Sequence, residues 1–531
     1  MPVQLIEKVQ DTNITAAAGT GWMNSVDPLY ANISDMWMKT LIDDFGTDHW
    51  YQLDGYFNGG TAPWLQDDND NTRNNNNDDD DISWFMRGKA AYEGLNRTDP
   101  DAVWSYQAWA FVGWNSAKQA QQIKSFVDAT PLGKFNIIDM SVNGDGEWKK
   151  TNFSSFWDAK IVWTTLSNFG GTDGMRGYLE RINAIPFDGP ENVWGTGFTP
   201  EGIDTNPVYF NFMLEMNWRE HPVNNVTEYV IQERHKRYGL SELNENVVRA
   251  WSALVNSSYA QDLSVQDGTG VAHVGSAESW AFENDRITPT PTLCQVHRAW
   301  RHLTAAASNL SSTQVYEPLR YDLVNLGREV LAQLVGPYGQ NFSDAMNAAK
   351  DRDLINLTSS AYVNVLHDLD RLVATDQAFL LGSWIEMARG MASDGEEDCT
   401  DTGYETIRSC SDFYEWNARV QLTTWNPTPK NAEKVPEGPI DYASKHWNGL
   451  IRDYYAERVA RYAAQAIKDA DASRPLNQTA ISQIAASLAY EWTTSTSKYP
   501  KVPYENFVDV AVEMQQKYAH VFDVCYDDDD E

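Results

Sequence analysis

The sequence lacks the motifs that mark several common classes of enzyme. Its 531 residues contain no HExxH, no paired CxxC, no GxxxxGKS/T and no GxSxG, which argues against a zinc protease helix, a P-loop and an activated serine. No apolar stretch approaches the roughly 20 residues of a membrane span. The opening stretch MPVQLIEKVQDTNIT has no apolar region of signal-peptide length. We therefore expect neither a metal nor another cofactor, and no membrane partner.

Basic residues and cysteine are also scarce. Lys and Arg total 41 against 75 Asp and Glu, and the net charge is −34, so nucleic acid is a poor partner because phosphate binding needs clustered cations. The four cysteines are too few for a disulfide scaffold. Cys399 and Cys410 bracket a short polar insert, where they could close a loop as a disulfide or remain unpaired.

Part of the negative charge is concentrated in two runs, DDNDNTRNNNNDDDD at 67–81 and DDDDE at the C-terminus. Such runs are usually solvated segments, with calcium binding as the alternative. The 21 Trp and 25 Tyr are typical of proteins that stack sugar rings on indoles, although large aromatics also fill cores. Ten Asn-x-Ser/Thr sequons favour passage through the secretory pathway.

Residues 1–221 repeat one pattern, in which a short aromatic or β-branched run ends on a polar residue and leads through a loop to a helical stretch. In a (β/α)8 barrel, catalytic groups stand at the carboxyl ends of the strands, so this pattern favours a barrel over a doubly wound sheet. Five strands do not close an eight-stranded barrel, and the sequence predicts a partial TIM barrel of about five βα units. The five runs cover 49–54, 102–109, 135–140, 160–166 and 193–198, and the polar residues are Asp54, Gln107, Asp139, Asn168 and Glu201.

Beyond Pro222 the strand-like runs stop and helical periodicity takes over. In YDLVNLGREVLAQLV (321–335), five apolar residues recur on one helical face: Leu323, Leu326, Val330, Leu331 and Leu334. We expect residues 222–531 to form an all-helical domain. The fold class is therefore α/β plus all-α.

Glu201 is the sharpest candidate for chemistry. It follows the glycine-rich run VWGTGF and precedes an apolar helix, which would place its carboxylate at the mouth of a barrel. The alternative is that Glu201 caps that helix, where an acidic side chain is favourable. Trp425 and Tyr442 flank a loop punctuated by four prolines, which suits either a pocket wall or a purely structural turn.

Several segments together resemble glycoside hydrolase family 89, the α-N-acetylglucosaminidases. They are DFGTDHWY, DAVWSYQAWAF, NFGG, GTGFTPEGIDTNPVYFNFMLEMNWR, RYDLVNLGREV, FLLGSWIEMAR, FYEWNARVQLTTW and IDYASKHWNGLIRDYY, in that order from about residue 40 to the C-terminus. The resemblance implies that the chain is the C-terminal part of a (β/α)8 barrel followed by a helical domain that helps wall the active site.

The resemblance also implies a function, namely retaining hydrolysis of terminal α-linked N-acetylglucosamine on an oligosaccharide or a glycosaminoglycan such as heparan sulfate. No metal or cofactor is needed for that reaction. A lysosomal or extracellular location would follow, with the signal peptide absent from this chain. A homo-oligomer is left open.

Site residues follow from the family motifs. The family's nucleophile lies in a PEG motif, which here gives Glu201, whereas its acid/base lies in an FNE motif that here reads FNGG, with Asn58 kept and Gly59 in place of the glutamate. Asp54 or an acidic residue of the following insert could substitute for that acid, or the chain could be a weak or inactive relative that still binds the sugar. Further pocket residues implied by the resemblance are Trp109, Phe169, Trp425 and Tyr442, and Ser167 replaces a histidine common before NFGG.

Overall fold

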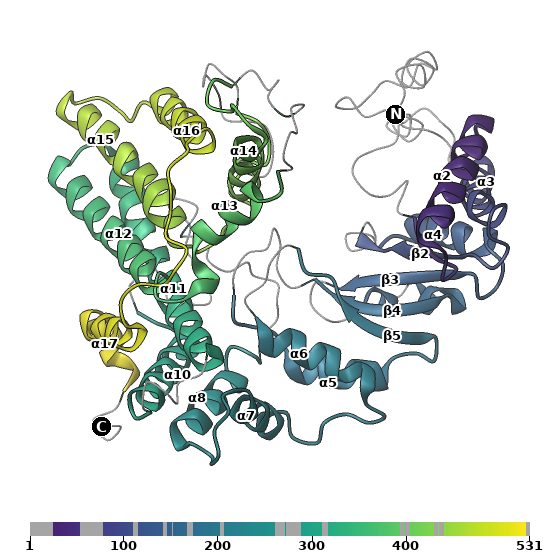
Figure 1. The fold of residues 1–531 in the computed structure, drawn as a ribbon, viewed down its shortest axis with the longest axis horizontal. Helices are drawn as coiled ribbons and strands as arrows, with labels where there is room; N and C mark the ends of the chain where they lie inside the picture. The colour runs from purple at the N-terminus through teal and green to yellow at the C-terminus, as the bar shows by residue number, and fades with distance from the viewer. Residues whose placement is uncertain are drawn as a thin grey trace. The chain divides into compact units, whose positions relative to one another are not determined.

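The computed structural model describes 14 stretches of the chain, and structural statements below concern these alone. They are residues 25–53, 78–109, 115–141, 146–150, 152–166, 174–201, 206–260, 271, 288–310, 317–392, 399, 404–428, 434 and 440–526. The chain folds as two compact units (Figure 1). The first, called the sheet unit, comprises Met1–Leu166, Arg181–Thr199 and Phe212–Pro222, and the second, called the helical unit, comprises Ser167–Glu180, Pro200–Asn211 and Val223–Glu531.

In the part of the chain that the structure describes, the sheet unit is built on five parallel strands in the order β1-β2-β3-β4-β5. The predicted βα rhythm is confirmed, and the partial TIM barrel with it. The strand predicted at 102–109 is shorter than expected, because β2 ends at Gln107 and leaves Trp109 in the loop that follows. The strands are β1 (Trp50–Gln52), β2 (Val103–Gln107), β3 (Phe135–Ser141), β4 (Lys160–Thr165) and β5 (Val193–Phe198).

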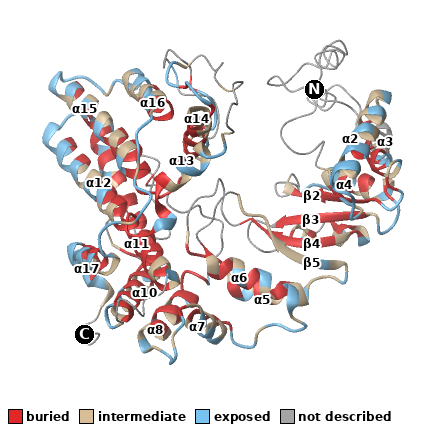
Figure 2. Cartoon of the chain, in the orientation of Figure 1, coloured by how far each residue is buried: buried red, intermediate tan, exposed pale blue. Residues whose placement is uncertain are grey.

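The sheet has two edge strands, and their amino ends meet. Within the described residues β1 pairs with β2 and β5 with β4, and Figure 2 shows β4 largely buried but β5 at intermediate burial. The indoles of Trp50 and Trp194 nevertheless stack, with ring centroids 5.4 Å apart and planes inclined by 13°. Within the described residues, no backbone hydrogen bonds join β1 to β5, but the sheet curls enough to bring these two edge strands into side-chain contact.

Helices pack on the sheet through an aromatic cluster. Phe126 lies edge-on to Trp84 and Trp104, at centroid distances of 5.8 and 5.7 Å. Gly88 allows this approach, since a Cβ there would come within 2.2 Å of the Phe126 ring. The helices of this part of the chain are α2 (Pro28–Phe45), α3 (Asp78–Asn96), α4 (Ala117–Ala129), α5 (Leu179–Asp188) and α6 (Pro207–Glu215), with short 3-10 turns at Glu147–Lys149, Ser154–Asp158 and Met216–Trp218.

The helical unit confirms the second half of the predicted fold. Its longest helix is α11 (Glu317–Ala348), which packs between α10 (Pro291–Ser308) and α12 (Arg352–Val373). The five apolar residues predicted to share one face are all buried, but so are Val324 and Asn325 beside them, because neighbours cover α11 on several sides. The other helices are α7 (Val226–Arg237), α8 (Glu245–Val255), α13 (Leu381–Arg389), α14 (Cys410–Leu422), α15 (Glu457–Asp471), α16 (Gln478–Thr493), α17 (Phe507–Lys517) and α18 (Ala519–Phe522), with a π-helical turn at Ile451–Ala456 and 3-10 turns at Gln377–Phe379 and Asp523–Cys525.

Two disulfides close the helical unit. Cys399 and Cys410 are paired, so the disulfide reading of the polar insert was the right one. The second disulfide joins Cys294 to Cys525, 231 residues apart. Spacing gave no signal for that pair, since it depends on the C-terminal segment returning to α10. No described helix has the combination of length and apolar character that crossing a membrane requires.

Candidate active site

Glu201 and Tyr442 form the centre of the candidate site. Both belong to the helical unit, and the Tyr442 hydroxyl donates to Oε2 of Glu201 over 2.7 Å. Both side chains are only partly buried, so the carboxylate is reachable from solvent. The following helix α6 begins at Pro207, six residues on, and Glu201 is therefore not the capping residue that was the alternative.

Trp425 lies against Tyr442 at this centre. The two rings are perpendicular, with centroids 5.3 Å apart and planes at 75°. Trp425 has a positive φ of 55° and 45% of its surface exposed. The backbone N–H of Trp425 bonds to the carbonyl of Val420 in α14, which fixes the strained turn. The exposed indole offers a flat apolar face, beside the tyrosine-bound carboxylate, on which a sugar ring could stack.

A buried ion pair holds the turn that carries Tyr442. Asp441 has a positive φ of 55°, and its N–H donates to the carbonyl of Thr423 over 2.6 Å. Its Oδ2 lies 2.6 Å from Nη1 of Arg458 in α15. Arg458 in turn stacks over the Tyr454 ring at 4.6 Å. Burial acts to lower the pKa of this guanidinium, but the charge of Asp441 opposes burial and the pKa is raised. The turn is therefore anchored to α15 by charge as well as by backbone bonds.

Helix α11 ties two further loops to the site. Arg328 bonds Nδ1 of His446 over 2.9 Å, four residues after Tyr442. The neighbouring Glu329 accepts from Arg328 over 2.8 Å and from the backbone N–H of Met175 over 3.3 Å. Arg328 and Glu329 are both buried. The RYDLVNLGREV segment thus positions the loop after β4 and the Tyr442 loop together.

The segment after Glu201 is fixed in a similar way. The side-chain amide of Asn206 donates to the carbonyl of Arg176 over 2.7 Å, and its oxygen accepts from the hydroxyl of Tyr259 over 2.8 Å. Asn206 and Tyr259 are buried. These bonds hold the end of the Glu201 loop against the loop that follows NFGG.

The other predicted site residues are not brought together by the described structure. Trp109 belongs to the sheet unit, where it is partly buried. Asp54, Asn58 and Phe169 lie outside the described residues, as does Gly59. Their parts in the site therefore stay predictions.

Two carboxylates at the end of β3 are coupled to one another. Asp139 is fully buried, and its Oδ2 accepts from the backbone N–H of Glu147 over 2.8 Å. Burial, with the charge of Glu147 adding to it, raises the pKa of Asp139 to about 8. Burial also raises the pKa of Glu147, against the opposing charge of Lys150. Asp139 was predicted as a strand-end polar group, whereas Glu147 was not, because it lies six residues beyond the end of β3, in a short 3-10 turn that the strand pattern does not mark.

No three His, Cys, Asp or Glu side chains are grouped as metal ligands would be, within the residues that the structure describes.

Comparison with known proteins agrees with this fold and these motifs. Residues 2–220 match the family model described as the α-N-acetylglucosaminidase (NAGLU) tim-barrel domain, and residues 228–517 match that of the α-N-acetylglucosaminidase (NAGLU) C-terminal domain. Human α-N-acetylglucosaminidase is 30% identical over 509 residues, covering 93% of this chain and 61% of the human protein.

Solved structures of a family 89 glycoside hydrolase from Clostridium perfringens share the fold. The complex with PUGNAc aligns with a TM-score of 0.71 at 21% identity, over 92% of this chain and 51% of that one. A variant with two Glu-to-Gln substitutions, solved with its substrate GlcNAc-α-1,4-galactose, aligns with a TM-score of 0.73 at 20% identity, over 93% and 52%. This chain spans about half to three fifths of these relatives.

The fold is therefore that of the family 89 glycoside hydrolases. Since family models match both halves of its length, the chain belongs to the α-N-acetylglucosaminidase family.

Proposed function

We propose that this chain carries the later part of a retaining glycoside hydrolase that removes terminal α-linked N-acetylglucosamine. The observation that carries the proposal is the bond from Tyr442 to Glu201, because it presents the PEG-motif carboxylate beside the exposed indole of Trp425. Human α-N-acetylglucosaminidase supplies the substrate class by similarity. An oligosaccharide or glycosaminoglycan of heparan-sulfate type is the proposed substrate.

The proposed reaction has two steps. Glu201 attacks the anomeric carbon and forms a covalent glycosyl-enzyme, while an acid protonates the leaving oxygen. That same group then removes a proton from the water that releases the sugar. The two carboxyl groups must lie about 5 to 5.5 Å apart. Tyr442 would hold the Glu201 carboxylate in place, and Trp425 would stack on the sugar.

The remaining sequence-based expectations form part of the same proposal. Residues 1–221 would be the partial barrel domain and 222–531 the helical domain that walls the site, which the two family matches support. The sequons support a secreted or lysosomal location.

The proposal is tested by release of the chromophore from an aryl α-N-acetylglucosaminide. An aryl leaving group needs little protonation, so the assay reports on Glu201 even if the acid is weak. If the chain turns over the aryl substrate much faster than GlcNAc-α-1,4-galactose, its acid catalysis is weakened. If the chain binds the sugar but shows no turnover of either substrate, it is the inactive relative that the Gly59 substitution allows.

Tyr442→Phe should lower kcat/KM for the aryl substrate by about 10- to 100-fold, because hydrogen bonds to a charged acceptor contribute roughly 1.5 to 3 kcal/mol. Steady-state kinetics measures this. Tyr490→Phe is the matched control, since Tyr490 is a partly buried tyrosine of the same unit that contacts the Tyr404 ring. Equal losses in the two variants would contradict a specific role for Tyr442.

Two residues are candidates for the general acid/base. Asp54 stands five residues before Gly59 in the family's acid/base loop. Glu147 is the structural competitor, because burial raises its pKa and a general acid needs a pKa close to working pH. Both follow strands of the same parallel sheet, whose carboxyl ends share one edge.

If Asp54 is the acid, Asp54→Asn should lower turnover of GlcNAc-α-1,4-galactose by about 100-fold or more while largely sparing formation of the glycosyl-enzyme from an aryl substrate. Added azide should then restore aryl turnover and give a glycosyl azide of retained configuration, since azide needs no base to attack the intermediate. Glu147→Gln is run in parallel. If Glu147→Gln, and not Asp54→Asn, shows both the loss on GlcNAc-α-1,4-galactose and the rescue by azide, the acid is Glu147 and Asp54 is rejected.

A further inference from the structure

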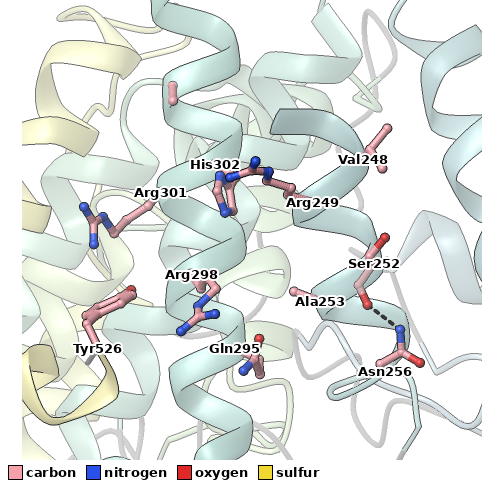
Figure 3. Close-up of a pocket in the computed structure, with 11 residues that line it drawn as sticks. Val248, Arg249, Ser252, Ala253, Asn256, Gln295, Arg298, Arg301, His302 and Tyr526 are labelled. Atoms are coloured by element: carbon pink, nitrogen blue, oxygen red, sulfur yellow. Dashed lines mark hydrogen bonds between the residues drawn. The ribbon is translucent and has the colours of Figure 1, made fainter. Parts of the chain in front are cut away.

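A cationic pocket lies between α8 and α10, both of which belong to the helical unit. Its volume is about 760 Å³, within the range of small-molecule sites. Figure 3 shows Arg298, Arg301 and His302 on one helix and Arg249 on the facing helix. The pocket is remote in sequence from the PEG motif and holds none of the residues of the candidate active site.

The charge of α10 is unusual for this chain. The protein has 75 acidic residues against 41 basic ones, yet the 18 residues of α10 contain two arginines, two histidines and no Asp or Glu. Leu293, Trp300 and Leu303 of this helix are buried in the core, whereas Arg298, Arg301 and His302 line the pocket. The helix therefore separates an apolar face from a basic one.

Three arginines lie close enough to His302 to act on its pKa. Burial first, and then the charges of Arg249, Arg298 and Arg301, lower the pKa of His302, while Glu245 opposes them. Glu245 forms an ion pair with Arg249, and the side chain of Arg249 is still 59% exposed. Within the described residues, no carboxylate lies within ion-pair distance of Arg301, whose guanidinium sits 4.8 Å from the centre of the Tyr526 ring. Clustered cations of this kind favour an anion between them.

Tyr526 gives the pocket a fixed wall. The disulfide from Cys525 to Cys294 ties this residue's neighbour to α10, and the Tyr526 hydroxyl lies 2.7 Å from Nδ1 of the buried His297. Arg298 also donates to the carbonyl of Cys525 over 3.4 Å. Ser252 on α8 and Asn256, which caps the C-terminus of α8, add polar groups to the opposite wall. A wall covalently attached to the arginine-bearing helix makes the site preorganised, which reduces the cost of ordering a ligand.

We propose that this pocket binds a small organic anion that carries a tetrahedral oxyanion, either a phosphate or a sulfate ester. Arg249, Arg301 and His302 contact the oxyanion, since guanidinium groups match the oxygens of such groups in pairs. Tyr526 and the polar residues of α8 contact the organic part. The site is distinct from the proposed glycosidase centre and does not depend on it.

Calorimetric titration tests the proposal with three probes: glucose 6-phosphate, glucose 6-sulfate and glucose. We expect one or both esters to bind and to protect the peptides of α8 and α10 from hydrogen exchange, and glucose to do neither. Binding of the phosphate alone or of the sulfate alone would support the proposal and define the anion. Equal binding of glucose would overturn it, because the anion would then contribute nothing.

Arginine variants locate the binding. Arg249→Gln/Arg301→Gln should weaken ester binding by about tenfold or more, since it removes two charge-assisted contacts. The control Arg352→Gln/Arg408→Gln removes the same net charge from exposed positions elsewhere in the helical unit, and it should leave the affinity nearly unchanged. Arg249→Gln alone changes a side chain that is more than half exposed, so its effect is independent of any folding defect in the double variant. Equal weakening by test and control variants would overturn the proposal.

A further variant tests whether the acidic C-terminal residues of the chain compete with the ester for the pocket. Asp527 to Glu531 directly follow Tyr526 in the sequence, and a full-length variant carries amides at these five positions. The proposal fails if neither this variant nor the natural sequence binds an ester.

Discussion

Glu201→Gln should reduce turnover of an aryl α-N-acetylglucosaminide by roughly 10⁴-fold or more, the scale of loss seen when an enzyme's nucleophile is removed. The amide keeps the shape of the side chain and an oxygen that can accept from Tyr442, but it cannot attack the anomeric carbon. The expected result is therefore a folded protein that still binds the sugar. Initial rates with the aryl substrate measure the loss.

Glu215→Gln is the matched control for Glu201→Gln. Glu215 ends α6, is partly exposed and pairs with Arg219 over 2.9 Å, so its loss should change the rate by less than about twofold, as for most surface pairs. Glu201→Ala adds a chemical test, because azide can occupy the vacated position and attack the anomeric carbon. The product should be the β-glycosyl azide, of inverted configuration. Activity of Glu201→Gln within tenfold of the natural chain would reject Glu201 as nucleophile.

The strands were predictable from the sequence because each carries its own signal. A buried parallel strand reads as a short aromatic or β-branched run, and the turn after it reads as polar or glycine-rich. Four of the five predicted runs end within two residues of the observed strands, and the fifth, 193–198, matches β5 at both ends. Trp109 marks the limit of this signal, since an aromatic residue just past a strand looks like part of it.

Contacts between distant segments were not predictable from local patterns. The bond between Glu201 and Tyr442 joins residues 241 positions apart. Local patterns marked each residue separately, and only the family resemblance placed both in one pocket. The pairing of Cys294 with Cys525 is of the same kind. Arg328 and Glu329 looked like ordinary helical residues, because nothing in a 3.6-residue pattern shows that neighbouring loops will use a buried ion pair as an anchor.

The contact between the two edge strands of the sheet was likewise not visible in the local sequence patterns. Trp50 and Trp194 were read as parts of two separate strands, and their stacking follows from the curl of the whole sheet. Because twist accumulates from strand to strand, the ends of a five-stranded parallel sheet can approach each other without exchanging backbone hydrogen bonds. The stack covers apolar surface on two strands that would otherwise stand at open edges.

Arg458→Met should lower the local unfolding free energy of the 440–456 segment by about 3 to 5 kcal/mol, the cost of leaving one member of a buried ion pair without its partner. Asp441 is buried to 1% exposure and bonds Arg458 through Oδ2, so the methionine would leave its charge uncompensated in a strained turn. Hydrogen exchange of peptides covering this segment reports the local opening directly. The tyrosine that holds Glu201 follows Asp441 in the chain, so kcat should fall with the local stability.

A double variant and a neighbouring arginine separate charge from packing in this prediction. Asp441→Asn/Arg458→Met removes both charges and should recover much of the lost stability, because replacing a whole buried pair by neutral groups costs far less than breaking it. Arg461→Met on the same helix breaks the partly exposed pairs with Glu457 and Glu491 and should cost no more than about 1 kcal/mol. If Arg458→Met and Arg461→Met prove equally mild, the Asp441 pair does not hold the turn. Tyr442 would then owe its position to the Thr423 backbone bond and to the His446 contact with Arg328.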